Sequence, residues 1–151
     1  MTQPPAAGVE RDVVLLTVPA DGAYLGVLRT AAAGLAARLH FTLDEIEDLR
    51  IAVDEACAML IRLAAPMATL RCRFELTGEE LGVEVAVSAA PEASPPATST
   101  FAWKVLTALA TDPSAAFSER TATIALTARR SNGEPRPGAR YAMGDPTENG
   151  G

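Results

Sequence analysis

Apolar and polar residues alternate along two neighbouring stretches in the middle of the chain, and this alternation restricts the fold more than any other feature. The stretches are TLRCRFEL at 69–76 and LGVEVAVS at 81–88, and TGEE separates them. Strand side chains point to opposite faces in turn, so each stretch has one apolar face. The short polar connection favours pairing as an antiparallel hairpin.

Two stretches before the hairpin have the helical period instead. From Asp21, which can cap a helix, to about Arg38, apolar residues recur at steps of three and four. Thr42 and Glu45 then form a capping box, in which each side chain accepts a hydrogen bond from the other residue's backbone N–H. A second helix is expected from there to Pro66. The two apolar stripes are Leu25, Leu28, Ala32, Leu35 and Leu39, and Ile46, Leu49, Val53, Ala56, Leu60 and Ala64.

The remaining elements complete the expected architecture. VVLLTV at 13–18 is typical of a strand, APEASPPATS at 90–99 of a loop, and TATIALTARR at 121–130 of a last strand, after a turn around Pro113. FAWKVLTALATD at 101–112 predicts a third helix, with one apolar side formed by Phe101, Val105, Leu106 and Leu109. The order of elements predicts an α+β fold, a two-layer α/β sandwich with three helices on one face of a mainly antiparallel sheet.

Composition and charge limit the function classes. Residues 1–11 and 131–151 are rich in Pro and Gly and are expected to be disordered, which leaves one domain over 12–130. The formal charge of -6 disfavours nucleic acid and membranes as partners. No apolar stretch is long enough to span a bilayer and no signal peptide is recognisable, so a cytoplasmic protein is expected. Cys57, Cys72 and His40 lack metal-ligand spacing, and Cys57 is expected to be a buried apolar residue.

Three segments together resemble the RsbW and SpoIIAB type of anti-sigma factor. They are VPADGAYLGVLRTAAAGLAARL at 18–39, FTLDEIEDLRIAVDEAC at 41–57 and the hairpin. The resemblance covers roughly 13–130 and implies the GHKL fold, which is the fold of the histidine-kinase-like ATPases and of this serine kinase branch. Within it, LRIAVDEAC resembles the N-box helix that contributes to the nucleotide site.

The resemblance also allows the nucleotide site to be compared residue by residue. Glu55 matches the N-box glutamate, which acts as general base in the family. Met59 stands at the position of the magnesium-binding asparagine, and Leu63 follows one further turn on. A thioether is a poor ligand for Mg²⁺, which prefers oxygen. Glu55 is therefore expected to be a relic of a general base.

The other two nucleotide boxes depart from the family pattern as well. No Asp and no Gly occurs between Ser88 and Thr100, where the family has an Asp-x-Gly-x-Gly box. Phe101 and Trp103 stand where small residues line the phosphates. We expect a degenerate pocket filled by Met59, Leu63, Phe101 and Trp103, with no cofactor. The alternative is ATP with magnesium, held by a lid that folds differently or by other metal ligands.

The resemblance finally implies partners. Family members bind a sigma factor and a STAS-type anti-anti-sigma protein at overlapping surfaces on the first helix, where Arg29 matches a shared contact. Arginine can hold a carboxylate by two parallel hydrogen bonds. Tyr24, Gly26 and Thr30 are candidates to complete this surface. Family members also form homodimers, and a run of alanines at 31–33 and 36 would suit either a dimer seam or a tight contact between helix and sheet.

The resulting hypothesis is an anti-sigma factor that sequesters a stress or developmental sigma factor by binding alone and is released by its antagonist. One alternative is an active serine kinase that binds ATP and phosphorylates the antagonist. Another is a scaffolding module with the same fold and no sigma partner.

Overall fold

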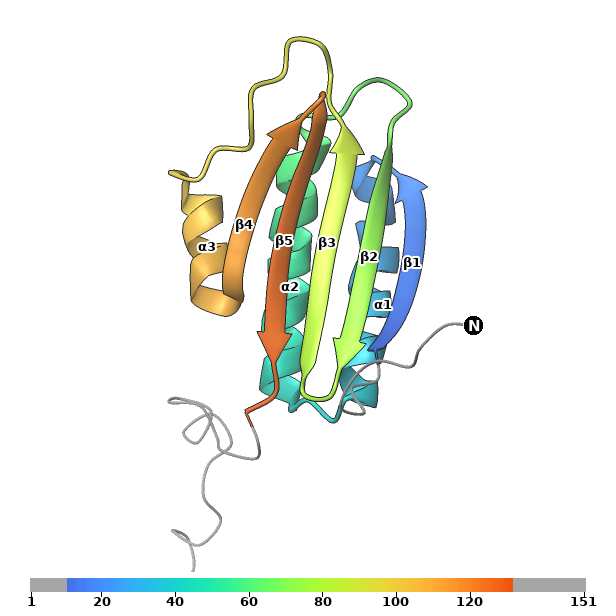
Figure 1. Cartoon of the computed structure of the whole chain (residues 1–151), viewed down its shortest axis with the longest axis vertical. Helices are drawn as coiled ribbons and strands as arrows, with labels where there is room; N and C mark the ends of the chain where they lie inside the picture. Colours follow the sequence, from blue (N-terminus) through green and yellow to red (C-terminus); the bar gives the residue numbers. More distant parts are fainter. Residues whose placement is uncertain (1–10, 132–151) are drawn as a thin grey trace, which may run out of the picture.

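The computed structural model describes residues 11–131, in which five strands form one antiparallel sheet (Figure 1). The order across the sheet is β1-β2-β3-β5-β4, so β1 and β4 are its edges. The expectations for residues 1–10 and 132–151 lie outside the described residues. The strands are β1 (Arg11–Pro19), β2 (Thr69–Thr77), β3 (Glu80–Ser88), β4 (Thr111–Ser118) and β5 (Thr121–Arg129).

Helices α1 (Leu25–Arg38) and α2 (Leu43–Ile61) lie across one face of this sheet, and α3 (Phe101–Leu109) packs beside α2 and β4 (Figure 1). The expected α+β sandwich is thereby confirmed. Asp21 does not cap α1 itself, because its carboxylate accepts from the Ala23 N–H at 2.9 Å and starts a short 3-10 turn, η2 (Gly22–Tyr24). Within residues 11–131, no helix is both long and apolar enough to cross a membrane.

The capping box that starts α2 is confirmed. The Glu45 N–H donates to Thr42 Oγ1 at 3.1 Å, and the Thr42 N–H donates to Glu45 Oε1 at 2.7 Å. The second carboxylate oxygen of Glu45 accepts from the Ser131 N–H at 2.8 Å, which ties the end of the described chain to this helix start. Burial acts to raise the pKa of Glu45, but these hydrogen bonds outweigh it and the pKa is lowered.

Helix α2 ends at Ile61, earlier than the expected stop at Pro66. Beyond Ile61 the hydrogen bonds change to the 3-10 pattern, because the N–H groups of Leu63 and Ala64 donate to carbonyls three residues back. Ala64 then pairs with Ala89 in an isolated bridge beside the end of β3. Leu63 therefore lies outside the helix that carries Glu55 and Met59.

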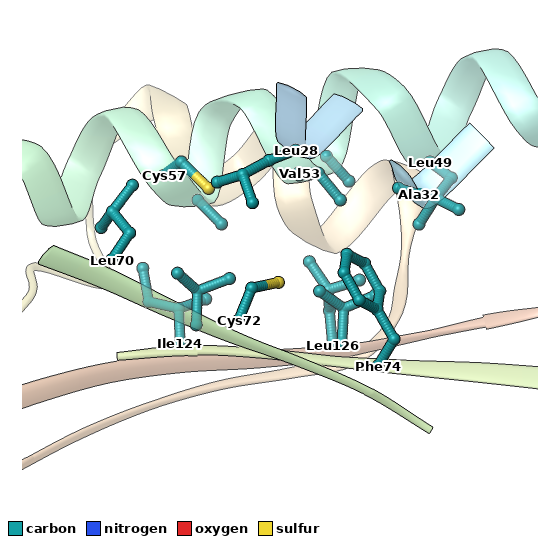
Figure 2. Packing of buried hydrophobic residues seen from close by; sticks show 14 of the residues in the cluster. Leu28, Ala32, Leu49, Val53, Cys57, Leu70, Cys72, Phe74, Ile124 and Leu126 are labelled. Carbon is teal, nitrogen blue, oxygen red and sulfur yellow. The ribbon is translucent and has the colours of Figure 1, made fainter. Parts of the chain in front are cut away.

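The core lies between the two covering helices and the sheet (Figure 2). Cys57 of α2 and Cys72 of β2 are both buried there, which confirms the expectation for Cys57. Burial raises the pKa of Cys72 to about 12 and raises the pKa of Cys57 further. Both thiols are therefore protonated at neutral pH. Ala32 and Ala36 are also fully buried in this core, so they belong to a contact within the monomer and not to a dimer seam.

The expectation of a turn around Pro113 is wrong, because residues 111–118 form the edge strand β4. The register of β4 on β5 shifts between Thr111 and Ser114, which places Pro113 in an irregular part of the edge strand. Proline is compatible with a sheet at such a bulged edge, where it removes no ladder hydrogen bond. Helix α3 correspondingly ends at Leu109 and not at Asp112.

The connection from β4 to β5 holds two non-glycine residues in the left-handed region, Glu119 at φ 50° and Arg120 at φ 62°. This conformation costs roughly 1–2 kcal/mol for a residue with a Cβ. We expect Arg120→Gly to raise the free energy of unfolding by about 0.5–1 kcal/mol, since glycine removes that cost but gains freedom in the unfolded chain. Urea denaturation measures the change.

Arg120→Ala is the matched control for this substitution, because it removes the same side chain and keeps the left-handed cost. Its midpoint is expected to stay near that of the wild type. The backbone must hold its position in both variants, since the Arg120 carbonyl accepts from the Ala89 N–H at 2.7 Å. A lower midpoint for the glycine variant would contradict the prediction.

Candidate functional site

Arg29 lies on the side of α1 that faces α2. Its Nε is 3.5 Å from Oδ1 of Asp54 on α2, and this ion pair joins the two helices. The two side chains are 40% and 39% exposed, so the pair lies at the surface and is open on one side. A surface ion pair of this kind stabilises the fold by at most about 1 kcal/mol.

The exposure of the Arg29 side chain does not include its Nε. Nε itself is buried, and no residue in the described part of the chain accepts a hydrogen bond from it. Gly26 lies one turn earlier on the same helix face, and a Cβ built there would meet Arg29 Nη2 at 3.6 Å. Nη2 of Arg29 therefore lies next to Gly26, which places no side chain against it.

Both helices carry further exposed side chains. Tyr24, in the turn before α1, is 42% exposed, and Thr30 is exposed beside Arg29. Ile51, one turn before Asp54 on α2, is 40% exposed. Val27 of α1 is 48% exposed, but it is two positions from Arg29 and lies on another side of the helix. Asp54, Val27 and Ile51 were not among the residues predicted from the sequence. The two apolar residues could have been found because both fall off the buried stripes of their helices.

The N-box positions have the geometry of one helix face but not the chemistry of a metal site. Glu55 is half-buried next to Asp54, and Met59 one turn later is 7% exposed and packs within the hydrophobic core. The Leu63 carbonyl accepts from the Ala90 N–H at 2.8 Å, which holds the start of the 90–99 loop against the end of α2. Among residues 11–131, no three His, Cys, Asp or Glu side chains group closely enough to hold a metal ion.

The expectation that Phe101 fills the former pocket is wrong, because this side chain is 80% exposed. Helix α3 begins at Phe101, and its Thr100 cap accepts from the Trp103 N–H at 3.2 Å. The face that meets the core is rotated by one position relative to the expected stripe. It is formed by Ala102, Trp103, Leu106 and Leu109.

The residues present do not fit a magnesium nucleotide of the kind that the GHKL fold binds. Buried Met59 offers a thioether where Mg²⁺ requires oxygen. The backbone N–H groups at the α3 N-terminus could bind a phosphate, but one of them, that of Trp103, already donates to Thr100 Oγ1. Two surface depressions among the described residues lie elsewhere, one lined by residues of β2, β3 and β5 and the other by Phe41, Leu49 and Leu109.

The chain is similar to proteins of a known family. The model of the histidine kinase-like ATPase domain matches residues 18–126. The anti-sigma-F factor RsbW of Mycobacterium tuberculosis, strain H37Rv, is 38% identical over 135 residues, which cover 83% of this chain and 80% of that protein. The chain belongs to the RsbW family.

Other RsbW proteins match over a shorter stretch. The serine-protein kinase RsbW of Bacillus subtilis, strain 168, is 45% identical over 53 residues, which are 35% of this chain and 33% of that protein. The similarity to the mycobacterial RsbW thus covers 83% of this chain, whereas this similarity to a protein named as a kinase covers 35% of it. The expected membership of the RsbW-type GHKL family is confirmed.

Proposed function

We propose that this RsbW-family protein is an anti-sigma factor that sequesters an alternative sigma factor and is released by a STAS-type anti-anti-sigma protein. The observation that carries the proposal is the 38% identity to an anti-sigma-F factor along most of both chains. The α1 surface supports it, because Arg29 is partly exposed and Ile51, an exposed apolar residue, lies one turn from its ion-pair partner Asp54 on α2. Arginine with apolar neighbours is typical of the energetically dominant part of a protein interface.

We further propose that the protein acts by binding alone. Loss of nucleotide binding is supported by the burial of Met59 at the position of the metal ligand and by the absence of Asp and Gly from the 90–99 loop. Glu55 is then a half-buried surface carboxylate without a phosphate to act on.

A homodimer is part of the proposal. Its support is the edge strand β1, on which Val13 and Leu15 are 44% and 73% exposed. An uncovered edge with exposed apolar residues favours pairing with a second strand. Of the alanine run, only Ala31 and Ala33, which are partly exposed, remain available to such a contact.

The experiment that tests the main proposal is capture by the purified protein from a lysate of its source organism, read by mass spectrometry. A sigma factor and a STAS protein that displace each other from the protein are the expected result. Capture of neither by a folded protein would favour the scaffolding alternative.

The kinase alternative is favoured by one observation, the retained Glu55, and calorimetric titration with Mg-ATP separates it from the proposal. We expect no saturable binding at micromolar nucleotide, because Met59 offers no oxygen at the position of the metal ligand. Glu55→Ala is expected to leave sigma factor binding unchanged. Saturable micromolar binding, together with phosphate transfer to the STAS protein that Glu55→Ala abolishes, would establish the kinase.

A further inference from the structure

The contact between Arg29 and Asp54 has an unusual form for an ion pair. At 3.5 Å, Nε is close enough for charge attraction but beyond the range of a good N–H···O hydrogen bond. A carboxylate that hydrogen-bonded fully to the guanidinium would occupy two of its donors. Asp54 therefore attracts the Nε side without using the end of the guanidinium.

The surroundings restrict where that end can point. Nε is buried while the side chain as a whole is 40% exposed, so the exposure belongs to other parts of the side chain. Gly26 provides no side chain beside Nη2. The two Nη atoms can then meet an incoming carboxylate end-on, with the Nε side held toward α2.

We propose that Asp54 is a positioning residue that holds Arg29 from the neighbouring helix and so prepares its Nη edge for an acidic side chain of the partner. This inference rests on the proposed function, because it assigns Arg29 to the partner surface. It adds that α2 contributes to recognition through Arg29, without Asp54 itself touching the partner. An arginine that is already ordered loses less side-chain entropy on binding than a free one.

Asp54 could instead compete with the partner for Arg29, and the Asp54→Asn substitution would then change the partner affinity in the opposite direction. If Asp54 competed with the partner for Arg29, removing its charge would strengthen partner binding. If Asp54 positions Arg29, removing its charge weakens binding. The sign of the Asp54→Asn effect therefore distinguishes positioning from competition.

The test compares Asp54→Asn with Glu47→Gln in the full-length protein. Glu47 is an exposed carboxylate of α2 that pairs with Arg50, so its substitution makes the same change in charge on the same helix. The Nε–H resonance of Arg29 in nitrogen-edited NMR is expected to shift and to exchange faster with water in Asp54→Asn, and to stay unchanged in Glu47→Gln. An unchanged resonance in Asp54→Asn would overturn the proposal.

Affinity for the captured sigma factor gives the second readout. We expect Asp54→Asn to weaken binding by about 5-fold and to have no further effect in an Arg29→Ala background, as coupled residues do. Unchanged or tighter binding by Asp54→Asn overturns the positioning role. If Arg29→Ala itself leaves the affinity unchanged, the partner surface under the proposed function is wrong, whatever the NMR result.

Discussion

Arg29→Glu is expected to lower the affinity for the sigma factor by about 100-fold, the loss typical of a central arginine in an interface. The substitution removes the guanidinium edge and places a carboxylate beside Asp54, where it also repels an acidic partner group. The fold is expected to persist, because the lost ion pair is at the surface. Isothermal titration calorimetry and a thermal melt measure the two quantities.

Arg38→Glu is the control for this prediction, since Arg38 is an exposed residue in the last turn of the same helix. It makes the same change in charge outside the Arg29 surface and is expected to bind nearly as the wild type does. Equal affinity for Arg29→Glu and wild type would remove Arg29 from the interface and favour the scaffolding alternative.

Phe74→Ala is expected to lower the free energy of unfolding by about 3–5 kcal/mol. Phe74 belongs to the interior strand β2, is fully buried, and packs beneath the helix layer (Figure 2). Truncation removes a large apolar surface from the core and leaves a cavity that the surrounding sheet cannot close. Urea denaturation followed by circular dichroism measures the loss.

Phe101→Ala makes the same chemical change at an exposed position. Because this side chain is 80% exposed, the expected change is within about 0.5 kcal/mol. A loss above that for Phe101→Ala would mean that the ring is covered in solution and would revive its role as a pocket filler.

The elements with strong local signals were predictable from the sequence. The start of α2 depends on the Thr42 and Glu45 side chains, which lie three residues apart and satisfy each other's backbone groups. The β2–β3 hairpin depends on alternation, and only its turn is tighter than expected, with Gly78 at φ 47° between the strands. Such features are encoded within a few residues and need no tertiary information.

The elements that depend on distant partners were not predictable in the same way. β4 contains proline and four Ser or Ala residues in TDPSAAFS, and it becomes a strand because β5 offers it an edge. Phe101 is apolar and begins an apolar helix, yet the direction of its side chain depends on how α3 docks on α2. The apolar character of Phe101 therefore predicted the wrong face of α3 as the one that packs against the core.

The candidate site was predictable only in part, and for a similar reason. Arg29 could be named from its resemblance to a family contact, but its neighbour Asp54 comes from another helix. Pairing across helices depends on their relative register, which a single sequence does not reveal. The ion pair between Arg29 and Asp54 is visible only in the structure, where α1 and α2 lie side by side.

Because both cysteines are buried, their reactivity reports how often the helix layer separates from the sheet. A protonated thiol enclosed between α2 and β2 reacts with an alkylating reagent only after the helix layer has separated from the sheet. The labelling rate of Cys57 and Cys72 therefore counts rare opening events in native buffer. The stability of each variant can be compared in this way without denaturant, in the presence or absence of a bound partner.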